Sequence, residues 1–156
     1  MVITPLLALL AGIVAQIGLA RALTARLKGW LAFFSGLAAL VATLIMIPMI
    51  RADGSFDTTL FDWDQNVPVA LHVDALSIVF MLLATGVGSA IVLYCVDYMA
   101  EEPGGVTRFY VLMLTFIAGM VLLVSSANML IAYVSWEVIG LCSYFLVGFW
   151  YTQSAA

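Results

Sequence analysis

Long runs of apolar residues, separated by short polar segments, dominate this chain. Because a transmembrane helix needs about 20 predominantly apolar residues, each run of that length predicts one membrane span. Three such runs are bounded by charged or polar residues. They cover residues 3–20, 30–50 and 75–96, and the breaks that follow them fall at residues 21–28, 51–74 and 97–107.

The last apolar run, residues 109–151, is too long for a single span. As one helix, its 43 residues would extend about 64 Å at about 1.5 Å per residue, roughly twice the hydrocarbon thickness of a bilayer. Turn-forming residues cluster inside it at Ser125-Ser126-Ala127-Asn128, which separates a fourth span from a fifth. The sequence therefore predicts an all-α membrane protein with five transmembrane helices, folded as a single bundle over residues 1–156.

The polar segment between the second and third spans carries a different pattern. Before Asp74, every second residue is apolar: Val67, Val69, Leu71 and Val73. This period of two predicts a short β-strand, and residues 60–63 are its expected partner in a β-hairpin. Asp74 ends the strand and, with Ser77 three residues later, is predicted to cap the third helix.

Composition excludes a water-soluble fold. Of the 156 residues, 65% are hydrophobic and 9% are charged, whereas an ordinary soluble domain is about half apolar and about a quarter charged. The lipid bilayer is therefore the expected environment. Nucleic acid is not an expected partner, because it requires a basic surface and this chain has a net charge of -4.

The basic residues predict an orientation. Three of the five, Arg21, Arg26 and Lys28, lie between the first two apolar runs. By the positive-inside rule this loop faces the cytoplasm or its organellar equivalent. We therefore expect an outside N-terminus and a C-terminus on the cytoplasmic or matrix side of a bacterial or organellar inner membrane. A cleaved signal peptide is the alternative for the first run, although no basic residue precedes it.

Few residues suit a redox or metal centre. Cys95 and Cys142 lie in different predicted spans without histidine or thiol neighbours, and we interpret them as packing residues. His72, the only histidine, lacks partners at ligand spacing and is interpreted as an interfacial ring. Because no phosphate-binding loop or haem-ligand pair is recognisable either, we expect no cofactor, no metal and no catalytic residue in this chain.

Glu137 is the one acidic residue in the middle of a predicted span. A charged side chain there is costly, faces a protein interior or a polar cavity, and indicates a functional site. On a helical wheel, Tyr133, Gly140 and Tyr144 share the face of Glu137, whereas the opposite side is mostly aliphatic. We therefore expect this face to point inward, with Tyr133 and Tyr144 as supporting polar groups.

Residue chemistry alone leaves two roles for Glu137. A desolvated carboxyl can take up and release protons near neutral pH, which would suit proton translocation. The alternative is a structural glutamate that stays neutral and hydrogen-bonded to a neighbouring helix.

The region around Glu137 resembles a known family. The run NMLIAYVSWEVIGLCSYFLVGFWYT, residues 128–152, is similar to the fifth-helix region of antiporter-like membrane subunits, most closely chain 5 or L of proton-pumping NADH:quinone oxidoreductase, complex I. The run VDALSIVFMLLATGVGSAIVLY, residues 73–94, resembles the third helix of that family. The pattern YM...RF between Tyr98 and Phe109 supports the match. The resemblance is strong over residues 71–152 and covers the first two helices only in layout.

The resemblance implies a role for Glu137. The matching glutamate of the family pairs with a lysine on the seventh helix and modulates proton movement along a polar axis at mid-membrane. Ala127 stands where many relatives carry an aspartate, so no role of that outer carboxylate is expected here. Relatives have about fourteen helices in two inverted repeats, and this sequence corresponds to the first five. Other membrane subunits are therefore the expected partners, including a chain that supplies the sixth helix onward.

These observations predict a membrane subunit, or N-terminal portion, of a respiratory NADH:quinone oxidoreductase-type complex. It would contribute to proton translocation coupled to electron transfer, with no redox chemistry in this chain. The alternative within the family is a subunit of an Mrp-type Na+/H+ antiporter or of a membrane-bound hydrogenase. A second alternative is a scaffold protein or fragment that assembles with such a complex without conducting ions.

Overall fold

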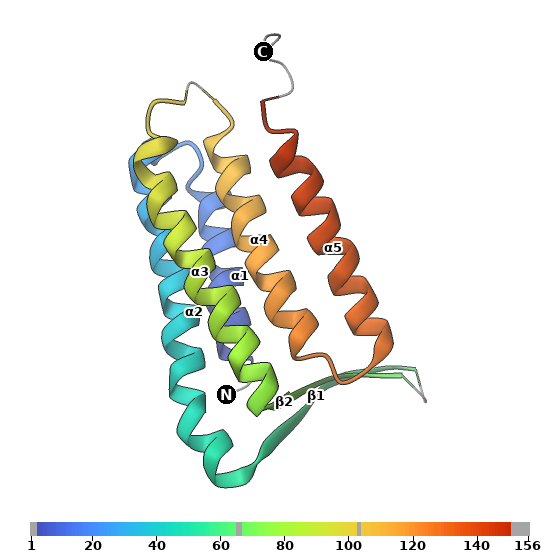
Figure 1. Ribbon diagram of the computed structural model, residues 1–156. Helices are drawn as coiled ribbons and strands as arrows, with labels where there is room; N and C mark the ends of the chain where they lie inside the picture. Colours follow the sequence, from blue (N-terminus) through green and yellow to red (C-terminus); the bar gives the residue numbers. More distant parts are fainter. Residues whose placement is uncertain (1–2, 65–66, 103, 151–156) are drawn as a thin grey trace.

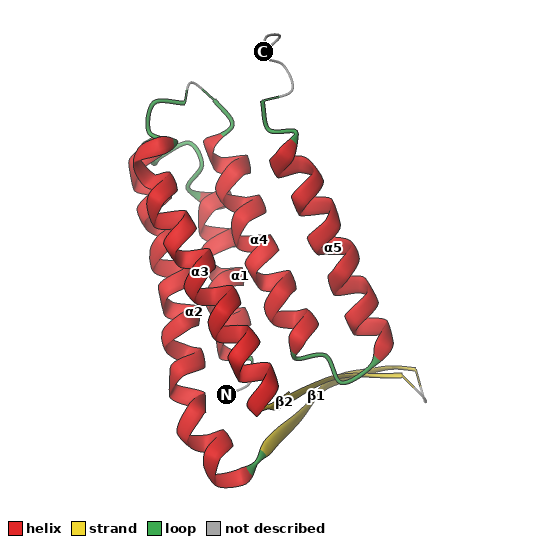
Figure 2. Ribbon diagram, in the orientation of Figure 1, coloured by secondary structure: helices red, strands yellow, loops and turns green. Residues whose placement is uncertain are grey.

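The computed structural model describes residues 3–64, 67–102 and 104–150. These residues form five helices and one β-hairpin (Figures 1 and 2). The helices are α1 (Thr4–Gly18), α2 (Ala25–Asp53), α3 (Ala75–Tyr98), α4 (Val106–Val124) and α5 (Met129–Val147), and the strands are β1 (Ser55–Asp64) and β2 (Val67–Asp74). The predicted α-helical membrane fold with a hairpin between the second and third helices is confirmed.

Four of the described helices, α2 to α5, are long and apolar enough to cross a membrane. The first predicted span is shorter than expected, because α1 has 15 residues and extends about 22 Å at about 1.5 Å per residue. It nevertheless runs alongside α2 and α4 within the bundle (Figure 1).

The second helix is longer than its apolar run predicted. With 29 residues it begins at Ala25, so Arg26 and Lys28 lie in its first turn rather than in the preceding loop. The long aliphatic stems of such residues can lie along a helix end while their charged heads remain in water.

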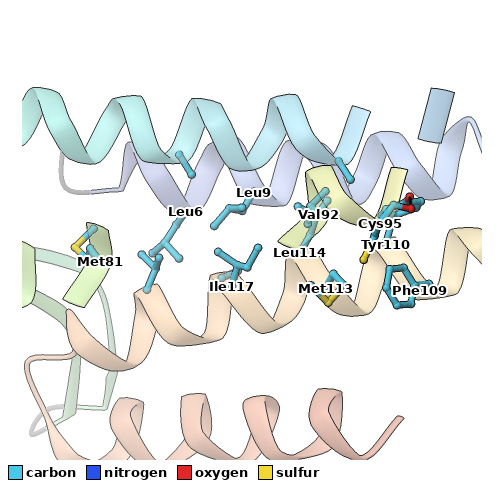
Figure 3. Close-up of a cluster of buried hydrophobic side chains, with 14 of the residues drawn as sticks. Leu6, Leu9, Met81, Val92, Cys95, Phe109, Tyr110, Met113, Leu114 and Ile117 are labelled. Carbon is cyan, nitrogen blue, oxygen red and sulfur yellow. Dashed lines mark hydrogen bonds between the residues drawn. The ribbon is translucent and has the colours of Figure 1, made fainter. Parts of the chain in front are cut away.

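Helices α1 to α4 enclose the hydrophobic core, and α5 lies at the edge of the bundle beside α4 (Figure 1). Leu9 of α1, Met81 of α3 and Leu114 of α4 are fully buried. Figure 3 shows that the labelled core side chains come from α1, α3 and α4 and gather between these helices. The core is therefore complete without most of α5.

Small residues allow the helices of this core to approach closely. A Cβ atom at Gly12 of α1 would lie 2.5 Å from the Cβ of Ser35 in α2. One at Gly36 of α2 would lie 2.6 Å from the Oγ of Ser89 in α3. Close packing at small residues is a main source of helix association in a bilayer, where lipid tails are as apolar as the side chains.

The hairpin is antiparallel, with Ser55 opposite Asp74 and Thr58 opposite Leu71. The second strand follows the predicted alternation, and Leu71 and Val73 are fully buried. The first strand is longer than predicted, because it begins at Ser55 directly after Gly54, which ends α2 with a positive φ of 84°. The hairpin therefore continues α2 and α3 beyond the apolar layer.

Asp74 caps α3 as the sequence predicted. Its Oδ1 accepts hydrogen bonds from the backbone N–H and from the hydroxyl of Ser77, each at 2.8 Å. These bonds favour the ionised carboxylate, and nearby His72 adds to the effect, so the pKa of Asp74 lies below its ordinary value of 3.8.

The Asp74 cap should make stability depend on pH. Because the pKa of Asp74 is lower in the folded protein, its ionisation stabilises the fold above the ordinary pKa. This contribution is lost as pH falls through the folded pKa, below 3.8. We expect Asp74→Ala to cost about 1 kcal/mol of unfolding free energy at pH 7 and to flatten the acid dependence. Unfolding in detergent micelles from pH 7 to pH 3 would measure both effects.

Asp74→Asn is the control, because it retains a capping acceptor that does not titrate. Equal losses of stability in the Asn and Ala variants would contradict the capping role.

The edge of β2 that faces away from β1 binds the turn between α4 and α5. The backbone N–H of His72 donates to the carbonyl of Ser125 at 2.8 Å, and that of Ala127 donates to the carbonyl of Ala70 at 3.1 Å. The hairpin thus passes beneath the ends of α4 and α5 (Figure 1). It fixes the point at which α5 begins.

Candidate functional site

Helix α5 begins where the sequence predicted a turn. Asn128 is its N-cap, and its Oδ1 accepts a hydrogen bond from the backbone N–H of Ile131 at 2.9 Å. The helix packs on α4 through a face that includes the buried Ser135 and Cys142. Ile139 on this face lies against Gly119 of α4, where a Cβ atom would come within 3.0 Å of the isoleucine.

The opposite face of α5 carries Glu137 and is exposed. Tyr133 is 58% exposed and Tyr144 is 73% exposed, and Glu137 itself is exposed. The expectation that this face points into the bundle is therefore wrong for the five described helices. The reason is that small Gly119 admits the aliphatic side of α5 to α4, which turns the Glu137 face outward.

Tyr133 and Glu137 are neighbours on one face of α5. They lie four residues apart, one helical turn, so that the phenol and the carboxyl group interact. Tyr144 shares the face but lies seven residues beyond Glu137, about 10 Å along the axis at about 1.5 Å per residue, where its ring contacts Phe145. Of the three predicted polar residues, the structure thus brings together Tyr133 and Glu137 but not Tyr144.

Glu137 lies near the middle of a 19-residue helix. At mid-bilayer a carboxyl facing hydrocarbon is costly, and one hydroxyl satisfies only part of its hydrogen-bonding capacity. Beside it, Gly140 has no atom within 4 Å of the position a Cβ would occupy. The face therefore combines a costly polar group with room for the close approach of another helix.

The hairpin contains a polar pair that sequence spacing did not reveal. Nδ1 of His72 lies 2.7 Å from Oδ1 of Asp57, its cross-strand partner. The two residues are 15 positions apart in the sequence, so only the strand register brings them together. His72 is thus a partly exposed hairpin residue with an acidic neighbour.

The two cysteines are not joined in a disulfide. Cys95 and Cys142 are both buried and unbridged, in α3 and α5 respectively. In the part of the chain that the structure describes, no group of three or more histidine, cysteine or acidic residues could hold a metal ion. The chemistry that α5 offers is therefore that of one carboxyl and its tyrosine.

Comparisons with known proteins point to one family. Residues 63–110 match the family model described as the N-terminus of NADH-ubiquinone oxidoreductase (complex I) chain 5. The chain is 40% identical over 123 residues to NADH-quinone oxidoreductase subunit L of Mycobacterium tuberculosis (strain ATCC 25618 / H37Rv), covering 74% of this chain and 19% of the relative. It is also 40% identical over 123 residues to subunit L of Escherichia coli (strain K12), covering 76% and 20%.

A chloroplast protein extends the similarity over nearly the whole chain. The NAD(P)H-quinone oxidoreductase subunit 5 of Chlorokybus atmophyticus is 32% identical over an alignment of 162 positions, covering 97% of this chain and 24% of the relative. The chain thus spans about a fifth to a quarter of the length of these three relatives.

Proposed function

We propose that this chain, which carries the N-terminal region of the antiporter-like family of subunit L and chain 5, acts as a membrane part of a proton-translocating NADH:quinone oxidoreductase-type complex. The observation that carries this proposal is the uncovered mid-span carboxyl of Glu137, in a chain whose relatives are quinone oxidoreductase subunits. In this proposal electron transfer belongs to other subunits of the complex.

In the assembled complex the Glu137 face is covered by a further membrane segment. The physical support is the cost of leaving a carboxyl against lipid, which the five described helices do not relieve. The covering segment supplies a polar partner, and Gly140 allows its backbone to approach. Glu137 then takes up and releases protons, and the neighbouring phenol of Tyr133 orients its carboxyl.

The proposal predicts a difference between the chain alone and the complex. Reconstituted alone into vesicles, the chain should show no proton flux above that of empty vesicles, because a conducting path needs successive polar sites and α5 offers one. A complex captured from mild detergent through a tag on this chain should oxidise NADH with quinone and acidify vesicles. A captured complex without NADH:quinone activity would contradict the assignment, and robust flux from the chain alone would contradict the need for partners.

For orientation we propose that the hairpin end faces outside and the Arg21 end faces the cytoplasm or matrix, following the distribution of basic residues. Cysteines introduced at Ser55 and at Arg21, both exposed positions, should react with an impermeant thiol reagent from opposite faces of the membrane. Cys95 and Cys142 are buried and should remain unlabelled. Labelling of both introduced cysteines from the same side would show that the proposed topology is wrong.

A further inference from the structure

A narrow apolar groove lies over α4, between α3 and α5. Its volume is about 390 Å³, and its walls include Leu83 and Val87 of α3, Met113 and Phe116 of α4, and Leu146 and Val147 of α5. In Figure 1, α4 lies between α3 and α5. The groove thus opens on the membrane-facing surface of the bundle.

A fixed positive charge lies at one end of this groove. Val147 also lines a second hollow, together with Arg108 and Tyr144. The guanidinium of Arg108 lies 5.1 Å from the ring centroid of Phe149 and donates to the carbonyl of Phe149 at 3.4 Å. The ring and the carbonyl therefore hold the guanidinium beside the end of α5.

The charge of Arg108 is not neutralised by the described part of the chain. Within residues 3–64, 67–102 and 104–150, no carboxylate lies within ion-pair distance of Arg108. The nearby loop carboxylate of Glu102 accepts a hydrogen bond from the indole of Trp150 at 3.2 Å. An exposed guanidinium with free donors is well suited to bind a phosphate group.

We propose that Arg108 and this groove form a binding site for one anionic phospholipid, with the phosphate at Arg108 and an acyl chain along α4. The dimensions agree with this ligand. From Arg108 to Met120, at the far end of the groove, the distance along α4 is about 18 Å at about 1.5 Å per residue, close to the hydrocarbon depth of one leaflet, about 15 Å.

The groove favours a lipid over other ligands. Free phosphate would leave the apolar walls uncovered. A helix is about 10 Å across and could only lie on the groove, whereas an acyl chain can enter a hollow of about 390 Å³. The inference does not depend on the role of Glu137, because the groove lies on the flank of α5 toward α3.

Native mass spectrometry of the chain in detergent, with dioleoyl phosphatidylglycerol or dioleoyl phosphatidylcholine added, tests the site. We expect one phosphatidylglycerol to be retained about tenfold more tightly than phosphatidylcholine, and Arg108→Gln to remove this preference. Arg21→Gln, which removes an exposed charge at the same end of the bundle, should retain it. Equal losses in the two variants would indicate diffuse attraction to basic residues and overturn the proposal.

A second pair of variants tests the groove. Ser143→Phe places a ring among the groove walls and should weaken the retention of phosphatidylglycerol several-fold. Ala90→Phe adds the same ring at an exposed position of α3 outside the groove and should have no effect. Displacement of the lipid by inorganic phosphate at physiological ionic strength, about 0.15 M, or unchanged retention in Ser143→Phe, would show that the acyl groove is not used.

Discussion

Replacing Glu137 with glutamine should leave the complex assembled while proton translocation per NADH oxidised falls by roughly tenfold or more. The amide keeps the volume of the side chain and can still interact with the phenol of Tyr133, but it cannot carry a proton. Positioned groups that transfer protons contribute about 10²–10⁴-fold to the rate of transfer. The measurement is vesicle acidification relative to NADH oxidation in the purified complex that contains the variant chain.

Two further variants distinguish titration from packing. Glu101→Gln changes an exposed acidic residue outside the helices and should not alter the ratio of protons to NADH. Tyr133→Phe removes the hydroxyl that interacts with Glu137 and should lower the rate less than Glu137→Gln, because the proton-carrying group remains. Normal assembly with unchanged pumping in Glu137→Gln would identify Glu137 as a permanently neutral, structural residue.

The second large effect is expected at the contact between α1 and α2. Gly12→Val should destabilise the chain by about 1–3 kcal/mol, the usual cost of overpacking. The new Cβ would meet the Oγ and Cβ of Ser35, and it would also lie 3.2 Å from Leu114 of α4. Because three helices converge at this position, no single side chain can move aside. Unfolding of the chain by a denaturing detergent, followed by helix content, measures the loss.

Gly140 provides the matched control for Gly12. It lies in α5, where a Cβ would meet no atom within 4 Å, so Gly140→Val should change the stability of the isolated chain by less than about 1 kcal/mol. In the complex the same variant should impair assembly, because the proposed partner approaches at this glycine. Equal destabilisation of the isolated chain by both variants would contradict the packing described for α1 and α2.

Much of the fold could be predicted because bilayer insertion leaves a strong pattern in the sequence. Apolar runs located α3 and the pair α4 and α5, and the alternation before Asp74 located β2. The residues at which the helices begin and end were less predictable from the sequence. Hydropathy cannot distinguish a loop from a polar first turn, so the start of α2 at Ala25 was missed. The early end of α1 at Gly18 was missed for the opposite reason, because apolar residues continue beyond it.

The candidate site was only partly predictable from the residues. A helical wheel separates the polar and apolar faces of α5 correctly, but it does not say which face meets α4. That choice depends on Gly119, eighteen residues before Glu137 in another helix. The pair His72 and Asp57 likewise depends on strand register, which alternation alone does not specify.

The bonds between β2 and the turn before α5 have a consequence for how the chain enters the membrane. Residues 70–72 and 125–127 can pair only on the same side of the bilayer, and α3 and α4 lie between them. The pairing is therefore lost if one of these helices crosses the bilayer without the other. If either fails to insert, the β2 edge and the turn are separated by the hydrocarbon layer, and these backbone groups stay unpaired. During biogenesis these backbone bonds would thus select chains in which α3 and α4 are inserted together.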